Sequence, residues 1–210
     1  IAHHYDVSNA FYKLFLDRGM QYSCAYFLSD DDTLEHAQQN KLRLIASKLA
    51  LKPGQKVLDI GCGWGDMALY LGRMADVKVV GVTLSKEQCK LANEKAKALG
   101  ISDRVRFELR DYRDLDEHFD RIVSVGMFEH VGAGFYDTYF KKMAALLKSD
   151  GIALMHTIGR SSPPGATNSF IAKYIFPGGY TPALSETMAA VERSGLVTAD
   201  VEILRLHYAR

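Results

Sequence analysis

A glycine-rich turn at residues 59–65 constrains the fold of this chain more than any other sequence feature. Its glycines stand at alternate positions, directly after the apolar run at residues 56–60 and before a helical pattern at residues 66–74. In open α/β sheets, ligands bind where the first strand turns into the first helix, and glycines there let the backbone approach a nucleotide closely. The turn therefore predicts a nucleotide site at the end of a first buried strand.

Short apolar runs and helical patterns alternate along the rest of the chain. Strands are expected at residues 56–60, 78–82, 104–109, 121–125 and 151–155, and helices at residues 42–49, 66–74, 85–100 and 135–147. Strands joined by helical crossovers run parallel, with helices on both faces of the sheet. The sequence therefore predicts the α/β class, as a doubly wound sandwich with a mostly parallel sheet.

Local patterns support these elements. Ser85 and Gln88 have capping-box spacing at the start of the helix that is expected to end at Gly100. Residues 202–207 alternate like a further strand. The helix before the last expected strand has one apolar face, formed by Phe135, Tyr139, Met143, Leu146 and Leu147.

Residues 1–210 are expected to form a single domain, because no repeat, low-complexity tract or long linker divides them. Residues 1–33 are expected to be a helical cover, rich in aromatic side chains, over the ligand edge of an α/β core at residues 34–210. The chain opens without a Met, and we expect it to be a fragment of a longer chain. Terminal residues are usually mobile unless they are packed, so a functional role for Tyr208 would require the polypeptide to continue past Arg210 into a helix that fixes this side chain.

Composition disfavours several classes of function. The 26 Lys and Arg residues balance 25 Asp and Glu, and a net charge of +1 predicts no nucleic-acid partner. No apolar run approaches the roughly 18 residues of a membrane span, and no signal peptide opens the chain, which predicts a cytoplasmic protein. Cys24, Cys62 and Cys89 are too widely spaced for a disulfide framework or a Cys-x-x-Cys zinc site, so no metal is expected.

The spacing of the glycines indicates which class of nucleotide the turn can bind. The turn reads GxGxG, whereas a dinucleotide fingerprint reads GxGxxG and is followed about 20 residues later by an acid at the end of the second strand. Here the second strand ends in Gly81, Val82 and Thr83, and no Lys follows the glycines of the turn. Hydride chemistry with a nicotinamide is therefore disfavoured, and a P-loop is excluded.

The turn resembles motif I of S-adenosylmethionine-dependent methyltransferases, which implies their Rossmann-like class I fold. Other segments match one family in order, namely HYDVSN at 4–9, YSCAYF at 22–27, GVTLS at 81–85, FEHVG at 128–132, HTIG at 156–159 and YIFPGG at 174–179. Together they are similar to the family of cyclopropane-fatty-acyl-phospholipid synthases and mycolic acid cyclopropane synthases. The resemblance covers nearly the whole chain.

This resemblance implies S-adenosylmethionine as the cofactor. Its expected contacts are Tyr22, Ser23, Asp59, Gly61, Gly63, Thr83, Leu84, Gln88, Asp111 and Tyr112. Tyr22 and Ser23 would close over the methionine end, and Asp59 would orient the glycine turn. Gln88 would reach the ribose hydroxyls if helix capping does not consume it, and Tyr112 would lie against the adenine, where Trp is commoner in the family.

The resemblance also implies a reaction, in which a methylene group is transferred to a cis double bond in an unsaturated fatty acyl chain of a phospholipid. A cyclopropane ring results, at the inner face of the membrane, with peripheral membrane contact. A bound bicarbonate is implied as the base, held by Cys24, Glu129, His156, Ile158 and Tyr208. Aromatic side chains at residues 5–27 and 174–176 would form an apolar pocket that shelters a carbocation.

Other interpretations stay open. A methyltransferase of the same fold can act on another lipid or a small amine without ring closure, and a cofactor-binding protein needs no catalysis. Cys24 can be a small buried hydrophobe, and Glu129 with His130 can be a helix-entry pair. A metal site at Glu129, His130 and His156 lacks the usual His or Cys spacing. The presence of the complete set Cys24, Glu129, His156 and Tyr208 favours ring closure, because methyl transfer to nitrogen or oxygen needs no base for a methyl proton.

Overall fold

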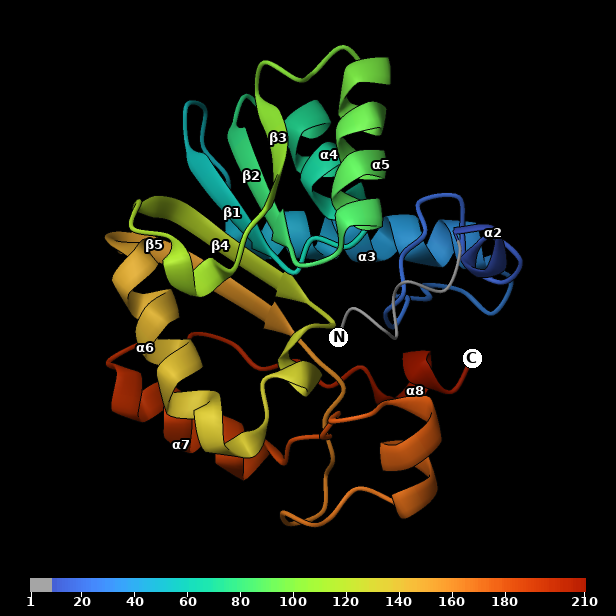
Figure 1. Ribbon diagram of the computed structural model, residues 1–210, viewed down its shortest axis with the longest axis vertical. Helices are drawn as coiled ribbons and strands as arrows, with labels where there is room; N and C mark the ends of the chain where they lie inside the picture. Colours follow the sequence, from blue (N-terminus) through green and yellow to red (C-terminus); the bar gives the residue numbers. More distant parts are fainter. Residues whose placement is uncertain (1–8) are drawn as a thin grey trace.

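The computed structural model describes residues 9–210, so the expected HYDVSN match lies almost wholly outside the described residues. Five parallel strands form one sheet in the order β3-β2-β1-β4-β5 (Figure 1). The strands are β1 (Lys56–Ile60), β2 (Lys78–Thr83), β3 (Val105–Leu109), β4 (Phe119–Val125) and β5 (Leu147–His156). This order, with β1 at the centre, brings the carboxyl ends of β1 and β4 together at the point where the strand order reverses.

Helices cover both faces of the sheet. They are α2 (Asn9–Tyr12), α3 (Leu34–Leu49), α4 (Asp66–Met74), α5 (Lys86–Ala98), α6 (Tyr136–Leu146), α7 (Leu184–Ser194) and α8 (Arg205–Tyr208). One buried cluster joins α3, α4 and α5 to one face of the sheet, and a second joins α6 and α7 to the other face. The predicted doubly wound α/β sandwich is confirmed. No helix within residues 9–210 is long and apolar enough to cross a membrane.

Several local predictions are confirmed residue by residue. The helix after the glycine turn spans Asp66–Met74 as expected. The Ser85 hydroxyl accepts a hydrogen bond from the Gln88 backbone N–H at 3.3 Å and so caps α5. That helix ends at Ala98, and Gly100 follows with a φ of +68°, which suits glycine.

Other local predictions are wrong. Phe135 and Leu147 lie outside α6, since Phe135 ends a short 3-10 turn with its side chain exposed and Leu147 begins β5. Residues 202–207 contain no strand, and α8 begins at Arg205. A pattern of period two makes a strand only where a neighbouring strand supplies hydrogen bonds, and no strand of the described chain pairs with these residues.

Little of the expected helical cover is helical. Within residues 9–33 the single helix is α2, and turns and loops follow it. The Asp17 carboxylate accepts hydrogen bonds from the backbone N–H groups of Gly19 at 3.0 Å and Gln21 at 2.7 Å, which favours a turn over a helix. Tyr12 still packs on Trp64 of the glycine turn, with ring centroids 4.8 Å apart. The segment covers this edge of the sheet mainly as a loop.

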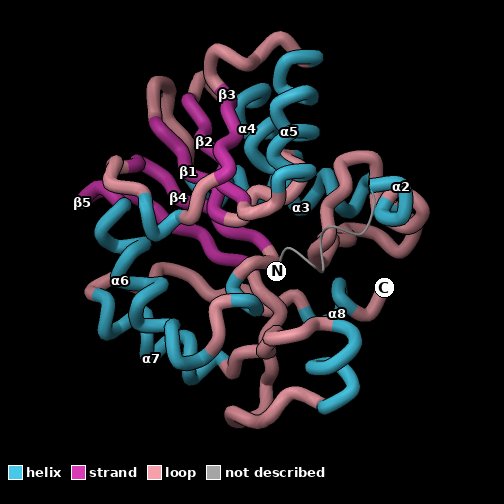
Figure 2. Tube along the Cα trace, viewed as in Figure 1, coloured by secondary structure: helices cyan, strands magenta, loops and turns pink. Residues whose placement is uncertain are grey.

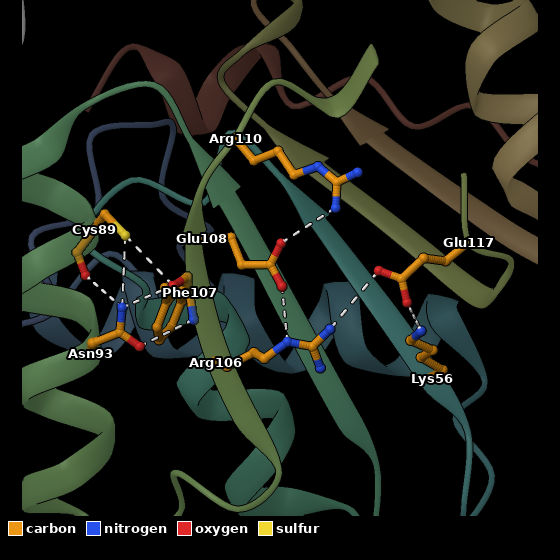
Figure 3. Close-up of polar contacts among 8 residues, drawn as sticks. All are labelled: Lys56, Cys89, Asn93, Arg106, Phe107, Glu108, Arg110 and Glu117. Carbon is orange, nitrogen blue, oxygen red and sulfur yellow. Dashed lines mark hydrogen bonds and ion pairs between the residues drawn. The ribbon is translucent and has the colours of Figure 1, made fainter. Parts of the chain in front are cut away.

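The edge strand β3 is tied to α5 by one amide side chain (Figure 3). Asn93 of α5 donates to the Phe107 carbonyl at 2.9 Å and accepts from the Phe107 N–H at 3.2 Å. These bonds satisfy strand-edge groups that no further strand covers. The Phe107 ring, in turn, lies where a Cβ on Gly65 or Gly81 would come within 2.6 Å of it. Glycine at both positions thus lets β3 pack directly against the glycine turn.

A row of surface ion pairs runs from β3 toward β1 (Figure 3). Glu108 pairs with Arg106 at 2.9 Å and with Arg110 at 3.8 Å, and Glu117 pairs with Lys56 and with Arg106 at 3.9 Å. Exposed pairs of this kind usually contribute about 1 kcal/mol or less each. The row therefore supplies surface charge more than stability.

Arg121 of β4, by contrast, is buried, and we expect its loss to destabilise the fold. Its guanidinium donates to the Leu49 carbonyl at 2.6 Å and to the Ala50 carbonyl at 3.1 Å, at the carboxyl end of α3. An Arg121→Met substitution leaves these carbonyls without that donor, so the free energy of unfolding should fall by about 2–3 kcal/mol. Urea denaturation measures the change, with Arg106→Met as the exposed control. Equal midpoints for the two variants would contradict the expectation.

Candidate active site

A cavity of about 340 Å³ opens at the carboxyl ends of the central strands. Loops gather at this edge of the sheet (Figure 2). The cavity wall includes every position expected to contact the cofactor: Tyr22, Ser23, Asp59, Gly61, Gly63, Thr83, Leu84, Gln88, Asp111 and Tyr112. The structure therefore brings the whole predicted cofactor set together in one place.

The glycine turn forms the floor of the cavity. Gly61 and Gly63 have φ values of +74° and +53°, a region that favours glycine. A Cβ on Gly61 would lie 2.7 Å from the Met127 side chain, whereas a Cβ on Gly63 would meet no described atom within 4 Å. Gly63 thus faces open space in the cavity, where a ligand can reach the backbone.

Asp59 lies at the end of β1 beneath this turn. Its side chain is buried, and its Oδ2 has no hydrogen-bond partner within the described residues. Burial raises the pKa of Asp59 to about 7, although a hydrogen bond from the Ala68 backbone acts in the opposite direction. An unpaired acceptor at the cavity wall fits a ligand that donates a hydrogen bond.

This pKa shift predicts a pH dependence of stability. Between about pH 4 and pH 7 the unfolded chain releases the Asp59 proton while the folded chain keeps it, so stability falls as the pH rises through this range. In Asp59→Asn this contribution is absent, and the variant should gain on the order of 3 kcal/mol relative to wild type from about pH 4 to pH 8. Urea denaturation across this range measures the difference. If the free energies of unfolding of wild type and Asp59→Asn change in parallel with pH, Asp59 does not titrate in this way.

A dinucleotide-binding fold has an acidic residue at the end of its second strand, and this chain has other polar groups at that place, the end of β2. The Thr83 hydroxyl donates to Oε1 of Gln88 at 2.9 Å. Helix capping uses the backbone N–H of Gln88, and its side chain stays at the cavity wall. Leu84 is half exposed beside them. Gln88 therefore combines a capping role with a side-chain position that can serve a ligand.

The loop after β3 supplies Asp111 and Tyr112. The Asp111 carboxylate accepts hydrogen bonds from Nε and Nη2 of Arg113 at 3.0 and 2.6 Å, and this partner holds the pKa of Asp111 below its usual range. The Tyr112 ring packs edge-on against Tyr139, with centroids 5.6 Å apart. Both contacts fix this loop at the cavity wall.

Residues 20–27 form a strap over the opposite wall, held by α3. Gln38 donates to the carbonyls of Gln21 at 3.3 Å and Ser23 at 3.1 Å, and Lys41 donates to the Ser23 hydroxyl at 2.6 Å. A Cβ on Gly126 would lie 3.6 Å from Ser23. The strap therefore lies against the loop that follows β4.

The residues assigned to bicarbonate lie outside the lining of this cavity, and Glu129 is central among them. Its Oε1 accepts the Ile158 backbone N–H at 2.6 Å, while its Oε2 is buried with no hydrogen-bond partner in the part of the chain that the structure describes. Burial raises the pKa of Glu129. His156 ends β5, and burial together with the Lys41 charge lowers its pKa to about 4. The imidazole is therefore neutral at physiological pH, and its Nδ1 has no hydrogen-bond partner among residues 9–210.

Cys24 and Tyr208 approach Glu129 from the strap and from α8. Partial burial and the charges of Cys24, Glu129 and Tyr22 raise the pKa of Tyr208. Near the same end of the chain, Nδ1 of His207 accepts the Phe27 N–H at 3.1 Å, and its ring lies 4.4 Å from that of Tyr26. α8 is thus attached to the strap, and Tyr208 is over half exposed.

Sequence reasoning missed Lys41, whose side chain is almost fully buried at the cavity wall. A signal was present, because Lys41 stands four residues before Ile45 on the expected apolar face of the helix. Asp66 and Met127 also line the cavity and were not predicted. Within residues 9–210, no group of three His, Cys, Asp or Glu side chains could hold a metal.

The strand order, the glycine turn after β1 and the cavity beside it define the class I S-adenosylmethionine-dependent methyltransferase fold. The solved structure of coclaurine N-methyltransferase, bound to N-methylheliamine and SAH, is similar at a TM-score of 0.78 and 26% identity. The alignment covers 88% of this chain and 56% of that one.

Sequence comparisons assign the chain to one family within this class of methyltransferases. The family model described as mycolic acid cyclopropane synthetase matches residues 1–210, and the chain belongs to that family. It is 51% identical to the cyclopropane-fatty-acyl-phospholipid synthase of Escherichia coli K12 over 90% of this chain and 48% of that protein. It is 48% identical to a probable fatty acid methyltransferase of Pseudomonas putida, over 100% of this chain and 55% of that protein. The chain therefore spans about half the length of these curated relatives.

Solved structures agree with the family match. The cyclopropane synthase MmaA2 from Mycobacterium tuberculosis is similar at a TM-score of 0.94 and 36% identity, covering 100% of this chain and 78% of that chain. The mycolic acid cyclopropane synthase CmaA1, complexed with SAH and CTAB, is similar at a TM-score of 0.92 and 39% identity, with the same coverage. The predicted family and fold are both confirmed.

Proposed function

We propose that this chain, as a single methyltransferase domain, transfers a methylene group from S-adenosylmethionine to a cis double bond in a phospholipid acyl chain. The observation that carries the proposal is the pair of unpartnered buried atoms, Oε2 of Glu129 and Nδ1 of His156, near the cofactor-sized cavity. Simple methyl transfer does not require such a second polar site. Cyclopropane formation does, because a proton must leave the transferred methyl group.

The cavity fits the cofactor. Open space above Gly63 admits a ligand to the backbone, and Asp59 offers an unpaired acceptor beside it. Gln88 and Tyr112 line the cavity where they would contact the ribose and the adenine of the cofactor. Ser23 lines the opposite wall, where it would contact the methionine end. S-adenosylmethionine supplies a methyl group on a positively charged sulfur. The residues of the chain supply its position relative to the alkene, which can lower the barrier by several kcal/mol.

The second polar site fits a bicarbonate ion. Oε2 of Glu129 can accept the bicarbonate O–H, and His156 can donate if its Nδ1 carries the proton. The Ile158 N–H is donated to Oε1 of Glu129 and so holds that carboxylate in position. The Tyr208 hydroxyl is a further donor for the anion. The small side chain of Cys24 is half-buried and would form part of the wall of this second site. All five residues then serve one anion, while the neighbouring cavity holds the cofactor.

The chemistry of the substrate explains why both sites are needed. The alkene electron pair forms a bond to the methyl carbon as the bond from that carbon to sulfur breaks, which leaves a cation on the second alkene carbon. Ring closure then requires that the added methyl lose a proton, so that the freed electron pair can bond to the cation; a bicarbonate held by Glu129 and His156 would supply the base for this proton. Aromatic faces stabilise cations, and Tyr22 of the strap stacks with Phe176, with ring centroids 6.5 Å apart.

The names of the relatives suggest two candidate substrate classes. One curated relative is named for phospholipid acyl chains and others for mycolic acids. We propose a phospholipid substrate, because identity to the phospholipid enzyme is 51% against 40% for the mycolic acid enzyme. We further propose that the protein works at the inner face of the membrane, in peripheral contact with it from the cytoplasm.

Labelled S-adenosylmethionine and vesicles of unsaturated phospholipid test the proposal. The expected product gains CH2 and loses its alkene, which proton spectroscopy detects as a cyclopropane methylene signal. A product that gains a methyl group and keeps a double bond would identify a methyltransferase without ring closure. Labelling of mycolic-type acids in preference to phospholipid would overturn the proposed substrate.

A further inference from the structure

Lys41 is a buried cation to which the proposed reaction assigns no role. Its side chain is 1% exposed and lines the cavity. Burial of an ammonium group is costly unless other groups compensate the charge, and burial lowers the pKa of Lys41 to about 8. The bond from its Nζ to the Ser23 hydroxyl, at 2.6 Å, fixes the position of the charge.

Two carboxylates lie within electrostatic range of Lys41. Asp17 and Asp66 both raise its pKa and so offset part of the effect of burial. These carboxylates are close to each other, since a Cβ on Gly19 would lie 2.4 Å from Oδ2 of Asp66 and 2.8 Å from Oδ2 of Asp17. Lys95 reaches the same place and donates to the Gly19 carbonyl at 3.3 Å. These carboxylates therefore place compensating negative charge near the Lys41 ammonium.

Cys24 and His156 also lie near Lys41. Cys24 directly follows Ser23 in the chain, and the His156 carbonyl accepts the N–H of Gly126, a residue whose Cβ would lie 3.6 Å from Ser23. The Lys41 charge lowers the pKa of the Cys24 thiol, against the larger effect of burial, and it adds to burial in lowering the pKa of His156. Both effects have the sign of a positive potential, which stabilises a thiolate and opposes an imidazolium. The same potential favours any small anion held between these two side chains.

We infer that Lys41 is a positioning residue that supplies positive potential to the anion site at Cys24 and His156 and anchors the strap through Ser23. The inference rests on the proposed function for the identity of the anion. Its electrostatic part concerns Cys24 alone and can be measured without catalysis.

The first test is the alkylation rate of Cys24 by iodoacetamide, followed by peptide mass spectrometry. Lys41→Met removes the charge at similar volume, so the thiolate fraction and the alkylation rate should fall by about 3- to 10-fold at neutral pH. Lys41→Arg keeps the charge and should restore the rate to within about twofold of wild type. Arg43→Met removes an exposed cation from the same helix and should change nothing. An unchanged rate in Lys41→Met overturns the inference.

A folding defect is separated from the charge effect by circular dichroism and by SAH affinity measured with calorimetry. If Lys41→Met does not fold, Lys41→Gln makes the same comparison with a polar side chain. The second test is the bicarbonate concentration for half-maximal turnover, which should rise about tenfold in Lys41→Met and little in Lys41→Arg. If wild-type turnover does not depend on the bicarbonate concentration, the proposal of bicarbonate as the base is refuted. The alkylation rate of Cys24 still decides the role of Lys41 in that case.

Discussion

Glu129→Gln should lower the turnover of lipid at least ~100-fold, the usual range for loss of a general base, because Glu129 is proposed to hold the bicarbonate that acts as this base. SAH affinity should stay within about threefold of wild type. The substitution keeps the size of the side chain and an oxygen that can accept the Ile158 N–H. It removes the carboxylate and places an amide where Oε2 now lies buried without a hydrogen-bond partner in the described chain. An amide that presents N–H groups there cannot accept the O–H of a bicarbonate ion.

The measurement is turnover at several bicarbonate concentrations, with SAH binding followed by calorimetry. Glu108→Gln is the matched control, because Glu108 lies in the surface ion pairs of β3 (Figure 3). Excess bicarbonate should recover part of the lost turnover only if Glu129 acts through binding of the anion. Turnover equal to wild type under all conditions would remove Glu129 from the mechanism.

Gly63→Val should weaken S-adenosylmethionine binding by at least ~100-fold. The Cβ of a substituted residue meets no protein atom within 4 Å, so the protein itself does not resist the new side chain. The added atoms enter the cavity at the place where a ligand would approach the backbone. A φ of +53° adds strain of about 1–2 kcal/mol for a residue with a Cβ.

Gly100→Val separates strain from obstruction of the cavity. Gly100 also has a positive φ, +68°, and open space at its Cβ, but it follows α5 and does not line the cavity. This control should lose stability and keep its affinity for S-adenosylmethionine in calorimetry. Affinity of Gly63→Val within a few-fold of wild type would place the cofactor elsewhere.

Much of the fold could be predicted from the sequence, because it depends on interactions between neighbouring residues. The limits of α4 follow from the glycine turn before it and from its own apolar period. The Ser85 cap of α5 is likewise a contact between residues three positions apart. The cofactor positions came from motifs and family resemblance, and all of them line one cavity. Those at or just after the ends of β1, β2 and β3 meet because parallel strands end at the same edge of the sheet, whereas Tyr22 and Ser23 reach the cavity in the strap.

The errors arose where local pattern competes with distant partners. Phe135 has the period of an α6 residue, yet a 3-10 turn comes first and leaves its side chain exposed at the cavity. Residues 202–207 alternate like a strand without a strand to pair with in the described chain. The loop that replaces the expected helical cover follows from hydrogen bonds between the Asp17 carboxylate and backbone N–H groups.

By itself the sequence determined the doubly wound sheet, the glycine turn and the family, because each is recorded in short runs of neighbouring residues. Only the tertiary structure decided that Lys41 is a buried cation beside Ser23, and that Glu129 and His156 keep unpaired atoms. Burial and hydrogen-bond partners depend on segments far apart in the chain, here α3, the strap, the end of β5 and α8. The charge and protonation of a site follow from that packing, since desolvation and neighbouring charges set each pKa.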